Sequence, residues 1–226
     1  MVKKATIGIC LALAVITACN AKDNAGDDGK TLDADKSYAF GVLMGADLKP
    51  FGFTFDYNAY IDGFKSCLDG NSKITEEDAV AIVQETINDS MKREAEANLE
   101  DGKQFLEENG KKNGMVTTES GLQYEVVKEA GGPKPAPDST VRVNYEGTLI
   151  DGKVFDSSYE RNEPAEFPLN QVISGWTEGI QLMSPGSHYK LYIPPELGYG
   201  DQPVGNGLIP ANSVLIFDVE LLDILK

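Results

Sequence analysis

Apolar side chains in the N-terminal part of the chain recur at the three- and four-residue spacing of amphipathic helices. We predict one helix at about residues 33–48 and a second at about 56–69, with Pro50 and Gly52 in the connection. The apolar stripes consist of Leu43, Met44 and Leu48 in the first helix, and of Tyr57, Tyr60, Ile61, Phe64 and Leu68 in the second. Segments this short cannot bury such stripes alone, so we expect a partner surface.

A much longer helix is predicted next, because no proline interrupts residues 75–112. Thr75 is the expected N-cap, acidic residues fill the first turn, and Gly110 and Gly114 indicate the stop. An apolar residue recurs every fourth position at Val83, Ile87, Met91, Ala95 and Leu99. Most other positions from Lys92 to Lys103 are charged or polar, so we expect the second half to be a solvated helix that joins two domains.

The pattern changes after Gly114 to strict alternation of apolar and polar residues, which predicts an antiparallel sheet with one buried face. The apolar positions are Val141, Val143, Tyr145 and Leu149, then Tyr189, Leu191 and Ile193, then Leu215, Phe217, Val219 and Leu221. Asp151-Gly152 is a hairpin signal, and 175–183 is the one good helical candidate here. The expected fold class is α+β: a C-terminal antiparallel sheet around a short helix, preceded by an all-α region.

Composition and charge narrow the function. The chain has 226 residues and a formal charge of -16, from 20 basic and 36 acidic residues. This balance argues against nucleic acid as a partner, because binding phosphate requires clustered Lys and Arg. The length allows one or two domains.

The first residues have the features of a targeting segment. Lys3 and Lys4 precede an apolar stretch at 7–16 that is too short to span a membrane. The sequence Ile-Thr-Ala-Cys at 16–19 resembles the lipobox of bacterial lipoproteins, which implies that residues 1–18 are cleaved and that Cys19 carries lipid. An ordinary secretory signal with an incidental cysteine is the alternative. After cleavage only Cys67 would remain beside Cys19, so no intrachain disulfide is expected. Residues 19–32 are polar and predict a flexible tether.

The sequence lacks the residues that several kinds of catalysis and ligand binding require. His188 is the only histidine and lies on the polar face of a predicted strand, so a catalytic triad has no base. The His and Cys sets of zinc sites and the glycine-rich phosphate loops are absent from the sequence, and no cofactor is expected. The many acidic residues leave a weak calcium site open, although no EF-hand spacing occurs.

An apolar, aromatic set with one carboxylate is concentrated in VFDSSYERNEPAEFPLNQVISGWTEGIQLM, residues 154–183. Such a set can bind an apolar peptide segment and exclude water. Rotation about an X-Pro bond requires little else, because twisting the amide removes the C–N double-bond character that creates the barrier. Ordinary core packing is the alternative for each aromatic residue taken singly.

The segments VRVNYEGTLIDGKVFDSS, FPLNQVISGWTEGIQLM, LYIPPELGYG and IPANSVLIFDVELL resemble the FKBP family of peptidyl-prolyl isomerases, over about residues 118–226. The resemblance implies a sheet of five or six antiparallel strands around a short helix, with the site between them. It implies catalytic roles for Tyr145, Phe155, Asp156, Tyr199 and Phe217, and substrate-binding roles for Phe167, Val172, Ile173, Trp176, Ile209 and Arg161. In the family the Trp ring is the pocket floor, the Ile backbone N–H and the Tyr hydroxyl hold substrate carbonyls, and Arg161 matches a position that pairs with the Asp.

The upstream part, SYAFGVLMGADL and the charged helix, resembles the dimerisation region of Mip-like bacterial FKBPs (macrophage infectivity potentiator). The resemblance implies a homodimer through the N-terminal helices and proline-containing polypeptides as clients. Macrolides such as FK506 or rapamycin are candidate ligands. Two departures put peptide preference and macrolide affinity in doubt: Ala165 stands where some members carry an aromatic wall, and the loop 201–208 differs from the short eukaryotic version.

We therefore expect a lipid-anchored isomerase of the bacterial cell envelope that assists folding of exported proteins. The expected domains are a signal peptide at 1–18, a tether at 19–32, a dimerisation region at 33–74, a connecting helix at 75–113 and an isomerase domain at 114–226. The rivals are a non-enzymatic holdase or chaperone, and a surface interaction lipoprotein with a vestigial isomerase domain.

Overall fold

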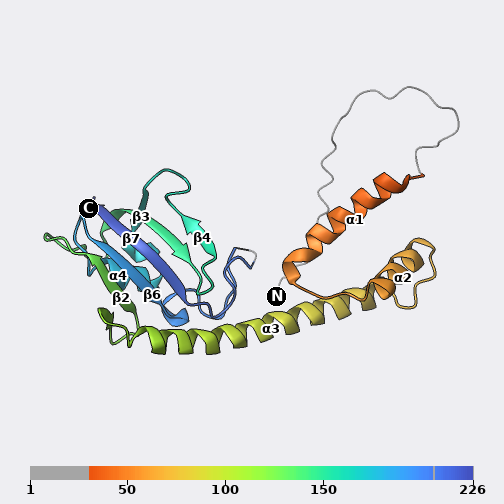
Figure 1. Ribbon diagram of the computed structural model, residues 1–226, viewed down its shortest axis with the longest axis horizontal. Helices are drawn as coiled ribbons and strands as arrows, with labels where there is room; N and C mark the ends of the chain where they lie inside the picture. Colours follow the sequence, from red (N-terminus) through yellow and green to blue (C-terminus); the bar gives the residue numbers. More distant parts are fainter. Residues whose placement is uncertain (1–30, 206, 226) are drawn as a thin grey trace, which may run out of the picture. The chain divides into compact units, whose positions relative to one another are not determined.

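The computed structural model describes residues 31–205 and 207–225 (Figure 1). The described chain forms two compact units that divide between residues 65 and 66. The expected signal peptide at 1–18, the lipid-bearing Cys19 and nearly all of the tether lie outside the described residues.

The first unit contains two helices joined by a short 3₁₀ turn. Helix α1 spans Ala34–Leu48, η1 spans Lys49–Phe51 and α2 spans Tyr57–Leu68, which confirms both predicted helices. Asp33 caps α1 by accepting a bond from the Lys36 backbone N–H at 2.9 Å. The Asp56 carboxylate accepts from the backbone N–H of Asn58 and Ala59 at 3.0 and 3.1 Å, which caps α2. Neither helix has a buried residue.

Helix α3 spans Glu76–Asn109 and begins where the sequence predicts. The Thr75 hydroxyl accepts from the backbone N–H of Asp78 at 3.1 Å, and three acidic residues occupy the first turn. The helix continues for 34 residues. None of the helices in the described part of the chain is long and apolar enough to cross a membrane.

The second unit is built on one antiparallel sheet with the order β1-β2-β6-β7-β3-β4, and β5 pairs with β3. The strands are β1 Met115–Thr117, β2 Gln123–Lys128, β3 Thr140–Thr148, β4 Val154–Ser157, β5 Ala165–Pro168, β6 His188–Ile193 and β7 Leu215–Ile224. The described residues thus contain seven strands rather than the five or six expected, because β1 and β5 are short additions. Strands β3 and β7 run side by side through the sheet (Figure 1).

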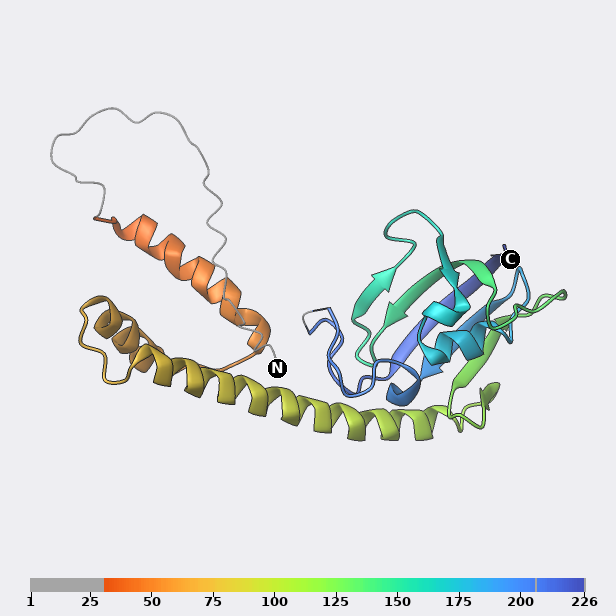
Figure 2. The same cartoon turned by 180° about the vertical axis from the view of Figure 1, so that it is seen from behind.

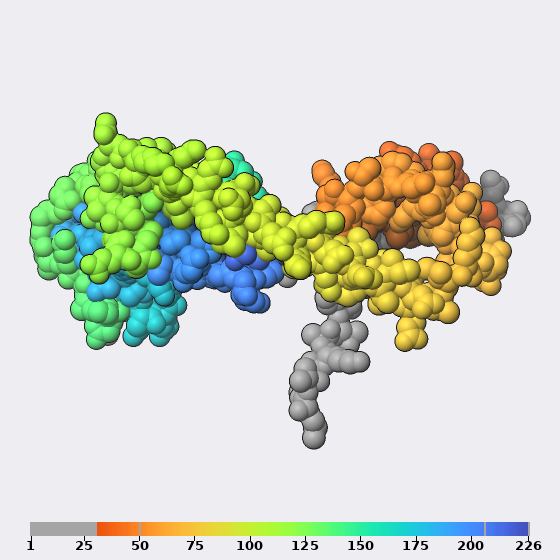
Figure 3. All heavy atoms as spheres, turned by 90° about the horizontal axis from the view of Figure 1, so that it is seen from below, coloured from red at the N-terminus to blue at the C-terminus, as the bar shows by residue number. Residues whose placement is uncertain are grey.

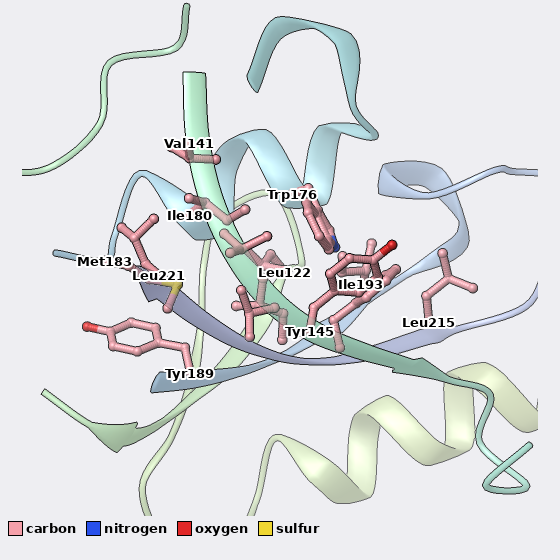
Figure 4. Close-up of a cluster of buried hydrophobic side chains, with 14 of the residues drawn as sticks. Leu122, Val141, Tyr145, Trp176, Ile180, Met183, Tyr189, Ile193, Leu215 and Leu221 are labelled. Carbon is pink, nitrogen blue, oxygen red and sulfur yellow. The ribbon is translucent and has the colours of Figure 1, made fainter. Parts of the chain in front are cut away.

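The core lies between this sheet and the short helix α4, Ser174–Ile180, which crosses one face of the sheet (Figure 2). The 3₁₀ turns η2, Leu169–Gln171, and η3, Pro195–Leu197, flank it in the chain. The alternation predicted for β3 and β7 is confirmed, because their apolar positions are buried and face α4 (Figure 4). Among the fully buried side chains are Leu122, Val141, Ile180, Met183, Leu191 and Leu221.

The second half of α3 is solvated on one side only, because its other face packs against the sheet, which its polar composition did not predict. Its positions Ala95, Asn98, Leu99, Gly102, Phe105, Leu106 and Asn109, spaced by three or four, are buried or partly buried. Phe105 covers Tyr192, whose ring centroid lies 6.1 Å away; Tyr192 is on the outer face of β6 yet only 7% exposed. Gln123 donates to the Leu106 carbonyl at 2.8 Å and accepts from Asn109 at 2.9 Å. The end of α3 therefore packs against the sheet (Figure 3).

Candidate functional site: an aromatic cavity beside a held carboxylate

A cavity of about 440 Å³ opens between α4, the inner face of the sheet and the loop that follows β6. It brings together every predicted site residue of the isomerase part except Arg161. The lining consists of Tyr145, Phe155, Asp156, Phe167, Gln171, Val172, Ile173, Trp176, Tyr199, Val204, Gly205, Leu208, Ile209 and Phe217. Asp156 is the one carboxylate among these side chains.

Three aromatic rings pack edge to face around Trp176, which α4 contributes to the cavity. Its ring centroid lies 5.0 Å from that of Tyr145, 5.1 Å from Phe217 and 5.4 Å from Phe167. Phe155 stands perpendicular to Phe217 at 5.4 Å. These perpendicular contacts are the preferred geometry of aromatic pairs, and they give the cavity rigid apolar walls. The buried Trp176 Nε1–H has no hydrogen-bond partner among the described residues.

Gly147 on β3 makes room for two of these rings. A Cβ at this position would lie 2.6 Å from the Phe155 ring and 2.9 Å from the Phe217 ring. Such distances are well inside van der Waals contact, so only glycine leaves room for both rings beside the β3 backbone. The sequence shows this glycine in YEGT but gives no reason for it.

The carboxylate of Asp156 is held from two sides. The Tyr145 hydroxyl donates to Oδ2, and Arg161 donates to Oδ1 and forms a salt bridge. Arg161 also donates to the Tyr145 oxygen at 3.0 Å and lies over the Tyr145 ring at 5.7 Å. Arg161 thus lies behind the carboxylate rather than on the cavity wall, in the pairing that the family resemblance implies.

Ionisation of the cluster follows from these contacts. Burial, reinforced by the bond to Asp156, raises the pKa of Tyr145 to about 12, so its hydroxyl keeps its proton near neutral pH. The hydrogen bond to Asp156 raises the pKa of Arg161 above its already high value. Burial, and secondly the charge of Asp156, raises the pKa of the Tyr199 hydroxyl. The site therefore offers one carboxylate and two tyrosine hydroxyls whose pKa values are raised.

The start of α4 and the loop after β6 contribute further lining residues. Ile173 is the N-cap residue of α4, with extended backbone, and it lines the cavity beside Val172. The Thr177 hydroxyl donates to the Leu169 carbonyl at 2.5 Å, which ties α4 to the turn before it. Across the cavity, Tyr199 is 40% exposed and Ile209 is 5% exposed.

Four further residues line the cavity that were not predicted from the sequence: Gln171, Val204, Gly205 and Leu208. Three of them lie in the loop 201–208, and their position between Tyr199 and Ile209 was the available signal. Ala165 does not line the cavity; it pairs with Val143 across β3 and β5 and packs against the core. The outer face of the sheet holds His188, which contacts Asp218. In the described part of the chain, no group of three or more His, Cys, Asp or Glu side chains could hold a metal ion.

A small antiparallel sheet wrapped on a short helix, with a Trp-floored aromatic cavity and a single held carboxylate, defines the FKBP class of prolyl isomerases. Family comparison agrees: "FKBP-type peptidyl-prolyl cis-trans isomerase" matches residues 131–222, and "Domain amino terminal to FKBP-type peptidyl-prolyl isomerase" matches residues 33–126. The chain belongs to the FKBP-type peptidyl-prolyl cis-trans isomerases.

Individual relatives match across most of the chain. The FKBP-type isomerase FkpA of Aeromonas hydrophila is 43% identical over 213 residues, covering 88% of this chain and 79% of the relative. The outer membrane protein MIP of Legionella longbeachae is 37% identical over 235 residues, covering 100% of this chain and 99% of the relative. The crystal structure of FkpA from Escherichia coli matches with a TM-score of 0.68 and 38% identity, covering 85% of this chain and 97% of that one.

Proposed function

We propose that this isomerase rotates X-Pro bonds in polypeptides of the bacterial cell envelope, with the aromatic cavity as its active site. One observation carries the assignment: the described cavity has rigid apolar walls and a single carboxylate, which Tyr145 and Arg161 hold in place. The barrier to rotation, about 18–20 kcal/mol, comes from C–N double-bond character, and no bond needs to be broken.

The cavity accelerates rotation by favouring the twisted amide over the planar one. The planar amide has the greater charge separation, so an apolar environment disfavours it relative to the twisted state. In this assignment the pyrrolidine ring of the substrate proline rests on Trp176 between Phe155 and Phe217. The charge of Asp156 orients the dipole of the rotating amide. The backbone N–H of Ile173 and the hydroxyl of Tyr199 bind substrate carbonyls on either side, so that binding energy from flanking residues supports the twist.

The test is a protease-coupled assay with short X-Pro peptides and a protein that starts at residue 31. We expect catalysis, with a preference for an apolar residue before proline, because Val172, Leu208 and Ile209 supply apolar wall. A correctly folded protein that leaves the exchange at its uncatalysed rate would overturn the assignment.

We further propose that the first unit forms a homodimer, as the family resemblance implies. A groove of about 600 Å³ between α1 and α2 is lined largely by apolar and aromatic side chains, including Phe40, Met44, Phe53, Phe55 and Phe64. Many of these side chains remain exposed in one chain, for example Phe40 at 56%, Tyr57 at 73% and Phe64 at 50%. A second copy would cover this surface with two-fold symmetry, the commonest arrangement of oligomers.

Sedimentation of residues 20–226 tests the dimer. Phe64→Glu places a charge in the groove and should give a monomer, whereas Asp62→Lys changes charge on the same helix at a position outside the groove lining and should remain dimeric. A monomeric unmodified chain, or a dimeric Phe64→Glu protein with unchanged affinity, would contradict the proposal.

The anchor and the location are proposals that rest on the sequence of the N-terminus. Cys19 would carry the lipid, and the name of the Legionella relative, outer membrane protein MIP, is consistent with an envelope location. Cys19→Ser should move the protein from the detergent phase to the aqueous phase, or leave it uncleaved. Unchanged partitioning would refute the anchor.

The isomerase cavity is also the candidate site for macrolides such as FK506 or rapamycin. Competition between a macrolide and the peptide substrate in the isomerase assay would reveal such binding.

A non-enzymatic chaperone role is the second candidate, and the same groove favours it. An apolar groove of about 600 Å³ can hold an unfolded segment when it is not covered by a second copy. Protection of an aggregating client that contains no proline separates this role from isomerisation, and it should be lost in Phe64→Glu.

A further inference from the structure

One wall of the isomerase cavity is a loop that closes on itself. We call residues 199–205 and 207–212 the cavity loop; its Tyr199, Val204, Gly205, Leu208 and Ile209 line the cavity. Its tip is held by a reciprocal pair of backbone bonds between Val204 and Ile209, at 2.9 and 3.1 Å. Its neck is closed by the Asn212 N–H, which donates to the Gly200 carbonyl at 2.8 Å.

Two asparagine amides tie this neck to helix α3. Asn98, on the helix, donates from Nδ2 to the carbonyl of Ala211 at 3.0 Å. Asn212, in the loop, donates from Nδ2 to the helical carbonyl of Ala95 at 3.1 Å. The two bonds run in opposite directions between the same two segments, and both are partly buried. We call this pair the asparagine clasp.

The backbone geometry at both ends of the clasp fits this attachment. Asn212 has φ +57°, a left-handed conformation that Asn tolerates better than most residues, and it directs the side chain to α3 while the N–H closes the neck. One turn along the helix, a Cβ at Gly102 would lie 2.9 Å from Val214 Cγ2. Only a glycine lets the helix approach the chain this closely just after the loop.

We propose that Asn98 and Asn212 are positioning residues for the isomerase: they fix the cavity loop on α3 and thereby set how tightly the site binds its peptide. Tyr199 directly precedes the neck residue Gly200, and Ile209 lies two residues before the clasped carbonyl of Ala211. Releasing the neck would therefore let both lining residues move. The opposite wall, with Phe155, Asp156 and Trp176, is held by β3, β4 and α4 and would not change.

The test uses the full chain with Asn98→Ala and Asn212→Gly, each of which removes one amide donor; glycine retains the left-handed backbone at 212. Asn88→Ala is the matched control, because Asn88 lies on the same helix and its side-chain oxygen accepts from Gln84, one turn away. The readouts are KM and kcat for an X-Pro peptide, and hydrogen exchange of the backbone amides at 199–212.

We expect each clasp variant to raise KM roughly threefold to tenfold, the effect of one hydrogen bond, while kcat changes little. Amides of the cavity loop should exchange faster, and those of β3 and β7 should not. The double variant should resemble the single ones, because either loss opens the same neck. The proposal is overturned if both variants match Asn88→Ala in KM and in loop exchange, or if kcat falls while KM stays unchanged.

The proposal rests on the assigned active site, and the two can fail separately. If the unmodified chain shows no isomerase activity, the assigned function fails, but faster exchange confined to the cavity loop would still support the clasp. Normal activity with unaltered exchange in Asn98→Ala and Asn212→Gly would retain the function and remove the clasp. If one variant does not fold, the other, which changes the opposite side of the same contact, decides.

Discussion

At the scale of single residues, Asp156 and Phe155 are the two residues of β4 that line the cavity. The carboxylate lies on β4, where Tyr145 and Arg161 hold it, and Phe155 precedes it in the same strand, packed on Gly147 and Phe217. Neither side chain belongs to the fully buried core, since both are partly exposed. Substitutions here should therefore change turnover more than stability.

We predict that Asp156→Ala and Phe155→Ala each lower kcat/KM about tenfold or more, because each removes an interaction with the rotating bond, and contacts with charged groups are worth about 1.5–3 kcal/mol. Tyr199→Phe should cost less, since it removes one hydroxyl from a half-exposed ring. Steady-state kinetics and urea unfolding of the three proteins provide the measurement. Wild-type kcat/KM in both of the first two variants would show that the site lies elsewhere.

The raised pKa of Tyr145 gives a pH prediction with a definite sign. Its pKa is raised from 10.0 to about 12 in the folded chain, so the folded state keeps a proton that the unfolded state loses. The stability that this provides is complete below pH 10 and is lost as the pH rises toward 12. We expect the stability difference between the unmodified protein and Tyr145→Phe to shift by about 1.4 kcal/mol per pH unit in that window. Denaturant unfolding between pH 9 and 11.5 measures it, and a constant difference would contradict the assignment.

At the scale of elements, the sequence predicted most of the fold because each element carried its own periodicity. Helices α1 and α2 followed their apolar stripes, α3 began at the predicted cap, and β3, β6 and β7 showed strict alternation. The site was predictable as a set because its residues fall in short motifs that resemble one family. The positions in β3, β4, α4 and β7 converge because the sheet wraps around α4.

The sequence did not reveal the contacts that small and polar residues make. The docked face of α3 includes Asn98, Gly102 and Asn109, which a hydrophobicity pattern counts as solvated. These residues pack because they allow a close approach and because their amides bond to Ala211 and Gln123. Tyr192 alternates with the apolar positions Leu191 and Ile193, yet Phe105 covers it. The cavity loop, rich in Gly and Pro, has no periodicity that would point its side chains inward.

The docking of α3 predicts that the stable isomerase unit begins before residue 115. A chain that starts at residue 115 loses Phe105, Leu106 and Asn109, and so exposes Tyr192 and leaves Gln123 without two partners. We predict that the free energy of unfolding of residues 92–226 is about 2–5 kcal/mol higher than that of residues 115–226, because the shorter fragment loses apolar burial and hydrogen bonds. Denaturant unfolding of both fragments is the measurement. Equal stabilities would mean that the end of α3 packs without contributing.

At the scale of the whole molecule, we propose that two functions divide between the two compact units. The unit from residue 66 onward contains the isomerase cavity, and the unit before it contains an apolar groove with no buried helix residue. A single X-Pro peptide needs only the cavity. A long unfolded client has many prolines, and two cavities joined in one dimer bind it at a higher effective concentration than two separate domains.

One experiment separates catalysis on a short peptide from help to a large client. Residues 20–226 and residues 92–226 should have similar kcat/KM on a short peptide, because each cavity retains its clasp and its lining. On the proline-limited refolding of a large protein, the longer chain should be faster at equal concentration of active sites, since only the dimer engages a client at two places. Phe64→Glu in the longer chain should reduce its refolding rate to that of the short form without changing peptide kinetics, and Asp62→Lys should not. Equal help from the dimer and from the monomeric forms would show that the N-terminal unit contributes nothing to client binding.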